Sequence, residues 1–100
     1  MAVDFSGKTG FERQDPRLVH AGLRALGNSP DVEVWFGSGE VTCHQQGRIG
    51  WCENGDVLFG HLLVEDASAD NLGDLVASAY TEINAFLQAS AYPCAFRFWH

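Results

Sequence analysis

The sequence predicts an α+β domain, and three features of the chain support this class. Short runs of alternating apolar and polar residues, typical of β-strands, follow one another between residues 31 and 64. An Asn54-Gly55 pair separates two of these runs and favours a tight hairpin turn. After residue 70, apolar side chains recur every three or four residues, which is the period of an amphipathic helix. One hundred residues allow a single domain with one core.

Composition excludes several classes of protein. Hydrophobic residues make up 46% of the chain and charged residues 19%, as in a globular domain rather than a disordered chain. Six Lys and Arg residues against 13 Asp and Glu residues give a net charge of −7, which argues against partners such as nucleic acid or a membrane surface. We expect no secretory signal and no membrane span. Three cysteines without a C-x-x-C spacing favour free thiols and a cytoplasmic protein.

Residues 1–30 predict an N-terminal arm followed by a short helix. Residues 1–14 are polar and have no apolar period, so we expect a loose arm there. Asp15 is suited to cap a helix, and Pro16 to occupy its first position. The helix is expected to end at Gly27, and its apolar stripe consists of Leu18, Val19, Leu23 and Leu26.

Residues 31–100 are expected to form the α+β domain itself. The strands are predicted over residues 32–36, 41–43, 48–53 and 56–64. Both alternating sets of side chains in the last of these strands are apolar, which indicates a strand covered on both faces.

One long helix and a final strand complete the predicted domain. The helix begins after Asp70 and runs for about 20 residues with one apolar face. That face consists of Leu72, Leu75, Val76, Ala79, Tyr80, Ile83, Phe86 and Leu87. Tyr92-Pro93 ends the helical pattern, and residues 95–100 are expected to form a strand because they are largely aromatic.

Neither glycine motif in the chain predicts a nucleotide site. Ser6-Gly7-Lys8-Thr9 matches the end of a phosphate-binding loop, but Ala2 stands where that motif requires its first glycine. Gly37-Ser38-Gly39 begins like a dinucleotide fingerprint, but Thr42 replaces the last glycine.

The cysteines and histidines do not predict a metal site either. Cys43, His44, Cys52 and His61 lack the paired short spacings of zinc ligands. Adjacent strand residues point to opposite faces, so Cys43 and His44 should not converge. We expect a small buried thiol beside a half-exposed histidine.

Arg97 is the candidate binding residue. It alternates with aromatic residues, so its guanidinium needs a planar acceptor, either a ligand carboxylate or a protein carboxylate such as Glu33 or Glu53. Arg48 is a weaker candidate of the same kind, and we expect it to be solvated at the start of a strand.

Three segments together resemble a known family. Gly47–Trp51, Asn54–Gly60 and the pattern Tyr92-Pro93-x-x-x-Arg97-x-Trp99, in this order around the long helix, are similar to the N-terminal half of chorismatases, also called pteridine-dependent dioxygenase-like proteins. The resemblance covers about residues 31–100. It implies a Rid (YjgF-like) fold, a mixed β-sheet packed on the long amphipathic helix, here preceded by the short N-terminal helix. Such units often assemble as trimers.

The resemblance also implies a function. Chorismatases release pyruvate from chorismate, leaving a hydroxybenzoate or a dihydroxycyclohexadiene carboxylate, and they need no metal or other cofactor. Arg97 and Trp99 are the residues expected to bind the substrate, while the main catalytic carboxylate belongs to the C-terminal half of the family. His100 departs from the family, which usually has Asn there. We therefore expect a domain of a longer two-domain enzyme that is inactive alone, with the missing C-terminal domain and identical subunits as partners.

Two other functions remain open from the sequence. One is a non-catalytic module that oligomerises and binds a small acid. The other is a stand-alone Rid-type enamine or imine deaminase, which would also use an arginine for the substrate carboxylate.

Overall fold

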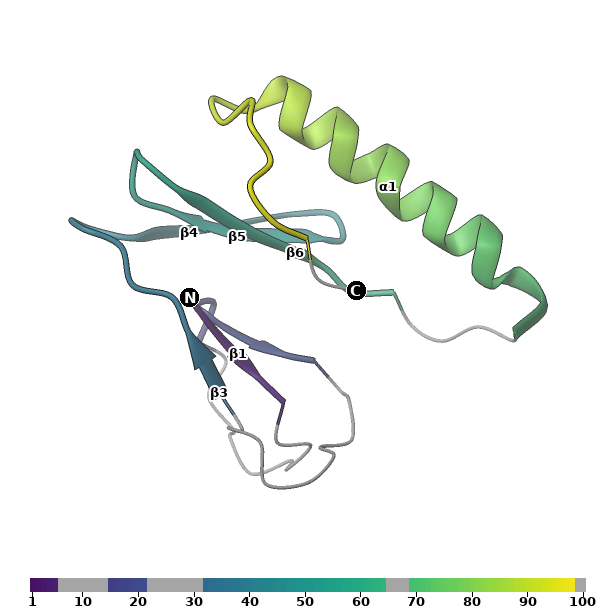
Figure 1. Cartoon of the computed structure of the whole chain (residues 1–100), viewed down its shortest axis with the longest axis horizontal. Coiled ribbons are helices and arrows are strands. Elements are labelled where there is room, and N and C mark those ends of the chain that lie inside the picture. Colours follow the sequence, from purple (N-terminus) through teal and green to yellow (C-terminus); the bar gives the residue numbers. More distant parts are fainter. Residues whose placement is uncertain (6–14, 22–31, 65–68, 99–100) are drawn as a thin grey trace.

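The computed structural model describes residues 1–5, 15–21, 32–64 and 69–98. These residues form two three-stranded sheets and one long α-helix, which confirms the α+β class (Figure 1). The second sheet lies between the helix on one side and the first sheet on the other (Figure 1). No described helix is both long enough and apolar enough to cross a bilayer.

The first sheet is built from the N-terminal third of the chain. It contains β1 (Ala2–Asp4), β2 (Leu18–His20) and β3 (Val32–Val34) in the order β2-β1-β3. The central strand β1 pairs with β2 in parallel and with β3 in antiparallel orientation. The predicted loose arm is therefore wrong for residues 2–4, because two strands distant in sequence satisfy their backbone hydrogen bonds.

The predicted N-terminal helix is wrong in its described part, because Leu18–His20 is a strand. Asp15 and Pro16 begin a turn instead: the amide of Leu18 donates to the carbonyl of Asp15 at 2.9 Å, and the amide of Arg17 donates to the Asp15 carboxylate at 2.9 Å. An Asp-Pro pair suits the first two positions of a β-turn as well as it suits a helix N-terminus. Leu23 and Leu26 lie outside the described residues.

The second sheet is a meander of three antiparallel strands. Its members are β4 (Thr42–Gln46), β5 (Ile49–Glu53) and β6 (Leu58–Leu62), in that order. Gln46 lies opposite Ile49, so β4 and β5 are joined by two residues, of which Gly47 has a φ of 59° that suits glycine.

The hairpin predicted at Asn54-Gly55 is confirmed, with a four-residue connection between β5 and β6. Gly55 has a φ of 93°, whereas none of the described residues other than glycine has a positive φ. The side-chain oxygen of Asn54 accepts hydrogen bonds from the amides of Asp56 (3.1 Å) and Val57 (2.9 Å). Asn54 therefore shapes the turn through its side chain rather than through a left-handed backbone.

The predicted long helix is confirmed as α1 (Leu72–Ala89), which follows a short 3₁₀ turn, η1 (Ala69–Asn71). It lies along one face of the second sheet (Figure 1). Phe86 contacts Trp51 of β5 with ring centroids 4.8 Å apart, and Glu82 pairs with Arg48. No residue of the helix is fully buried.

The predicted final strand is wrong for Ala95–Phe98, which is irregular in the structure. A strand exists only where a neighbour supplies backbone partners, and no described strand pairs with this segment. The prediction that β6 is covered on both faces is also wrong, since none of its residues is buried. Among the described residues, the buried apolar core is Val19, Ile49 and Cys52.

Candidate functional site

The predicted binding residue Arg97 is exposed on the irregular segment that follows α1. Trp99, its predicted neighbour in the site, lies outside the described residues. Of the protein carboxylates considered as partners for Arg97, Glu33 accepts a hydrogen bond from the indole of Trp35 at 3.0 Å, and Glu53 pairs with His44 at 3.3 Å. The segment that carries Arg97 is held against the rest of the domain by hydrogen bonds of Tyr92.

Tyr92 attaches this segment to the β5–β6 turn. Its hydroxyl accepts a hydrogen bond from the amide of Gly55 at 3.1 Å. At the helix end, the amide of Tyr92 donates to the hydroxyl of Ser90 at 3.1 Å, and that hydroxyl donates to the carbonyl of Leu87 at 2.8 Å. The chain leaving α1 is thus held at both the helix end and the turn, five residues before Arg97.

Asn54 connects the same turn to a third segment. Its side-chain amide donates to the carbonyl of Ser38 at 2.8 Å. Gly37 lies so close that a Cβ at this position would overlap the Asn54 side chain. Asn54 therefore joins the Gly37–Gly39 loop to the turn that holds Tyr92. The sequence indicated Asn54-Gly55 as a turn, Tyr92-Pro93 as the end of the helix and both as parts of a family pattern, but it did not indicate that the two pairs contact each other.

We expect Tyr92→Phe to lower the free energy of unfolding by about 0.5–1.5 kcal/mol, because it removes the acceptor for the Gly55 amide and little else. Urea unfolding followed by circular dichroism measures this loss. Thr42→Val is the matched control: it also removes one hydroxyl, but its hydrogen bond is longer, at 3.5 Å, so the change should be small. Equal effects of the two substitutions would show that Tyr92 does not hold the segment.

An aromatic cluster occupies the helix-facing side of the second sheet. His44 stacks on Trp51 with ring centroids 5.1 Å apart and an interplanar angle of 25°. Its Nε2 atom lies 3.3 Å from a carboxylate oxygen of Glu53, and Trp51 in turn contacts Phe86. These contacts place the side chain of His44 against Trp51 and Glu53, so His44 belongs to the junction between sheet and helix.

Arg48 lies at the same junction, exposed directly before β5 as predicted, and it also contacts α1. Its guanidinium makes two contacts with one carboxylate oxygen of Glu82, at 2.5 and 3.1 Å. Both side chains are partly exposed, at 42% and 35%. A pair this exposed contributes at most about 1 kcal/mol to stability. In this structure the guanidinium of Arg48 thus contacts a protein carboxylate, that of Glu82 on α1.

The opposite face of the second sheet carries the two cysteines and His61, and it faces the first sheet (Figure 1). Cys43 and Cys52 lie directly opposite each other and form a disulfide, so the prediction of free thiols is wrong for both. Cys94 is an exposed thiol outside this bond. Among the described residues, no three His, Cys, Asp or Glu side chains are grouped as metal ligands.

His61 lies over the backbone of Gly50, where only a residue without a Cβ leaves room for the imidazole. Its Nδ1 atom is buried and has no hydrogen-bond partner in the described part of the chain. Burial lowers the pKa of His61 below its ordinary value of 6.5, because the charged form loses hydration. The stability that the neutral form provides is therefore present above pH 6.5 and is lost as the pH falls through the lowered pKa.

An aspartate–histidine pair joins two strands of the first sheet. The carboxylate of Asp4, only 3% exposed, lies 3.0 Å from Nδ1 of His20 on the neighbouring parallel strand. A buried carboxylate requires such a partner, so this contact fixes the pairing of β1 with β2.

Comparison with known proteins gives one match. The model of the family described as "Chorismatase FkbO/Hyg5-like, N-terminal" matches residues 33–100, from β3 through the Tyr92 and Arg97 segment. No curated protein and no solved structure gives a significant match. The match spans both hairpins of the second sheet, α1 and the segment that Tyr92 holds, which is more than half of the chain. The chain that folds in this way belongs to the chorismatase FkbO/Hyg5-like N-terminal family.

Proposed function

We propose that this chain forms the N-terminal half of an enzyme that hydrolyses chorismate and releases pyruvate. The observation that carries the proposal is the family match over residues 33–100. In this proposal the chain supplies one wall of the substrate cleft, and a C-terminal unit of the same protein supplies the catalytic carboxylate. A chorismatase-type function follows from the family, whereas the products and the division of roles are proposed.

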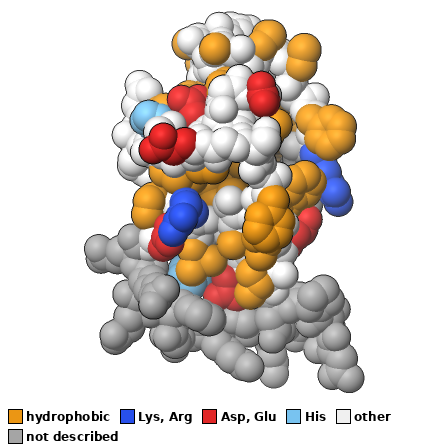
Figure 2. Space-filling model, turned by 90° about the vertical axis from the view of Figure 1, so that its left-hand side faces the viewer, with side chains coloured by type: hydrophobic (Ala, Val, Ile, Leu, Met, Phe, Trp, Pro, Cys, Tyr) orange, Lys and Arg blue, Asp and Glu red, His pale blue; other side chains and the backbone are white. Residues whose placement is uncertain are grey.

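The small core of the described residues supports the need for a second unit. Among the described residues only three apolar side chains are buried, and two of them, Ile49 and Cys52, lie on opposite faces of β5. Large apolar side chains that remain exposed include Phe36, Val57, Leu63, Leu72, Val76, Phe96 and Phe98. Figure 2 shows hydrophobic side chains across the middle of one face of the molecule, with charged side chains between them. Apolar surface of this extent is typical of a face that another unit covers.

Arg97 is the residue proposed to bind the substrate. Chorismate carries two carboxylates, and a guanidinium can bind a carboxylate through two parallel hydrogen bonds. Arg97 is exposed, and its segment is fixed to the domain through Tyr92, so its charge is presented at the surface where the second unit would close the cleft. Trp99, two residues further along, is proposed to pack beside the substrate.

The proposed chemistry is an acid-assisted loss of the enolpyruvyl group. A proton donated to the enol ether and attack by water give an unstable adduct that breaks down to pyruvate and a ring alcohol. The role of Arg97 is to neutralise a substrate carboxylate and to hold the ether in position for that proton. The acid itself is assigned to the C-terminal unit.

A pyruvate assay tests the division of roles. We expect residues 1–100 alone to release no pyruvate from chorismate above the uncatalysed rate. A polypeptide in which the same chain continues into the family's C-terminal unit should release it steadily, as measured with lactate dehydrogenase and NADH.

The two parts of the proposal fail in different ways. Pyruvate release by residues 1–100 alone would contradict the need for a second unit. No release by the extended polypeptide would contradict the hydrolase function. Release of ammonia from an imino acid by residues 1–100 would instead favour a deaminase.

A further inference from the structure

The disulfide joins two residues that lie directly opposite each other on β4 and β5. Gln46 and Ile49, which flank the two-residue turn, are a pair joined by mutual backbone hydrogen bonds. Pairs with and without such bonds alternate along the ladder from there, so Cys43 and Cys52 are a pair without them. Side chains come closest at such pairs, and the two Cα atoms are 4.0 Å apart. The fold alone therefore brings the two sulfur atoms together.

The strands do not depend on this bond for their pairing. The turn at Gly47 sets the register of β4 and β5, and the hairpin at Asn54-Gly55 holds β5 on its other side. The bond closes only a short loop, since the two cysteines are nine residues apart. The sheet can therefore keep its arrangement whether the sulfur atoms are bonded or reduced.

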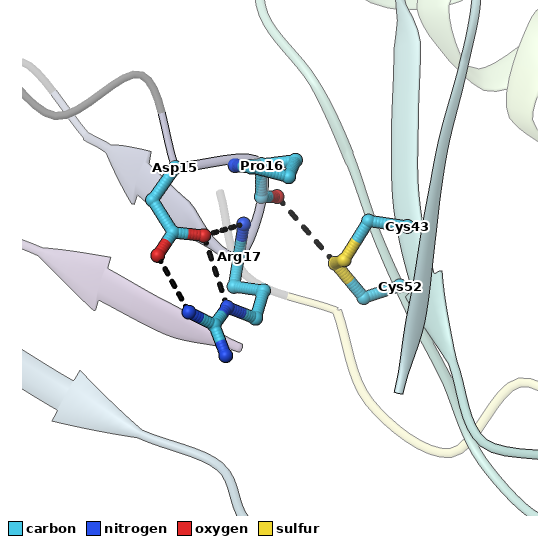
Figure 3. Close-up of polar contacts among 5 residues, drawn as sticks. All are labelled: Asp15, Pro16, Arg17, Cys43 and Cys52. Atoms are coloured by element: carbon cyan, nitrogen blue, oxygen red, sulfur yellow. Dashed lines mark hydrogen bonds and ion pairs between the residues drawn. A yellow bond between two sulfur atoms is a disulfide. The ribbon is translucent and has the colours of Figure 1, made fainter. Parts of the chain in front are cut away.

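The two sulfur atoms differ in their surroundings. Cys52 is only 4% exposed, whereas Cys43 is half-buried on the outer strand β4. The sulfur of Cys52 lies 3.4 Å from the carbonyl oxygen of Pro16 (Figure 3). A bonded sulfur has no hydrogen to donate, but a thiol at this position can donate one to that carbonyl. The structure thus holds a ready acceptor for the reduced form of Cys52.

The Pro16 carbonyl is held firmly in this place. On either side of it, Asp15 and Arg17 form a paired contact, with the guanidinium donating to the carboxylate at 3.0 and 2.8 Å (Figure 3). These contacts raise the pKa of Arg17 and keep the turn closed. The turn lies against the sulfur of Cys52, and Cys43 is the less buried of the two residues, so we expect an external reagent to reach the two sulfur atoms unequally.

We propose that Cys43 and Cys52 form a reversible dithiol–disulfide couple that exchanges with small thiols of the glutathione class, and that exchange occurs at Cys43. A thiolate attacks the Cys43 sulfur, the bond between the cysteines breaks, and Cys52 leaves as a thiolate that takes a proton. A second small thiolate attacks the external sulfur of the mixed disulfide, which releases Cys43 and the oxidised small disulfide. In the reverse direction, the small disulfide is the oxidant and two small thiols are the products.

The test uses the full chain carrying Cys94→Ser, which removes the exposed third thiol. Incubation with reduced and oxidised glutathione at a series of ratios, followed by acid quenching and mass spectrometry, gives the fraction of bonded protein. We expect one reversible transition with the same midpoint from both directions, while circular dichroism stays unchanged. Loss of the strand signal on reduction, or a bond that is reduced only in denaturant, would overturn the proposal.

A pair of variants tests the site of exchange. With oxidised glutathione, Cys52→Ser leaves Cys43 to react, and Cys43→Ser leaves Cys52 to react, both in the Cys94→Ser chain. We expect the mixed disulfide on Cys43 to form at least about tenfold faster, because access limits the reaction at Cys52. In denaturant the two rates should become similar, which controls for the intrinsic reactivity of each position. Equal rates in the folded chain would contradict the assignment of Cys43.

Discussion

Replacing Trp51 with alanine should lower the free energy of unfolding by about 2–4 kcal/mol. Its ring contacts Phe86 of α1 on one side and His44 of β4 on the other, so one truncation removes packing between helix and sheet and within the sheet. A domain of this size has a total stability of about 5–15 kcal/mol, so the loss is a large share. Urea unfolding measured by circular dichroism gives both the stability and the helix content.

Phe96→Ala is the matched control for this experiment. It also removes an aromatic ring, but that of Phe96 is 92% exposed in the chain by itself. The change in unfolding free energy should stay within about 0.5 kcal/mol. If Trp51→Ala also fell within this range, the contact of α1 with the sheet would contribute no stability, and the aromatic cluster would need another role.

Arg97→Lys should weaken substrate binding or turnover of the extended, pyruvate-releasing protein by about 1.5–3 kcal/mol, equivalent to roughly 10- to 150-fold. Lysine keeps the positive charge but loses the planar pair of donors that binds a carboxylate at two points. Because Arg97 is exposed, the melting temperature should change little. The rate of pyruvate release against chorismate concentration gives KM and kcat separately.

Arg48→Lys distinguishes a ligand role from a protein role. Arg48 is also partly exposed and pairs with a carboxylate, but that carboxylate belongs to Glu82 of α1. Its substitution should leave KM unchanged and lower stability by at most about 1 kcal/mol. If Arg97→Lys behaved in the same way, with lower stability and unchanged kinetics, Arg97 would be removed from the proposed site.

The parts of the fold that depend on neighbouring residues could be predicted from the sequence. The β5–β6 hairpin and α1 are of this kind, because a turn dipeptide and a helical period are set by residues a few positions apart. The strand of residues 41–43 was predicted too short, and β4 extends to Gln46 because Gly47 allows a two-residue turn that restores pairing with β5.

The parts that depend on distant residues could not be predicted. Ala2 pairs with Leu18 and Val34, and nothing in the composition of residues 1–14 indicates these partners. Asp15-Pro16 suits two local structures equally, and the strands on either side decide between them. The opposite error occurred at Ala95–Phe98, where a strand-like composition finds no partner among the described strands.

The sequence indicated one residue of the candidate site but not the hydrogen bond that holds its segment. Arg97 was predicted as a ligand residue from its type and its aromatic neighbours, and this stays a prediction; the structure shows that Arg97 is exposed. The hydrogen bond from Gly55 to Tyr92 joins residues 37 positions apart, and no local pattern signals it. The disulfide did have a signal: once Gly47 and its neighbour are taken as a two-residue turn, counting outward along both strands places Cys43 opposite Cys52.

The antiparallel pairing of β1 with the distant strand β3 has a consequence for the order of folding. The second sheet needs only closures of two and four residues, which are fast, whereas β1 must wait for β3, with Ala2 opposite Val34. During synthesis, β1 leaves the ribosome before β2 and β3 and remains without its antiparallel neighbour until about 30 further residues have followed. Although β1 precedes the other described strands in the chain, its pairing is thus among the last to be completed, and β1 is the strand of this domain most dependent on protection from misassociation.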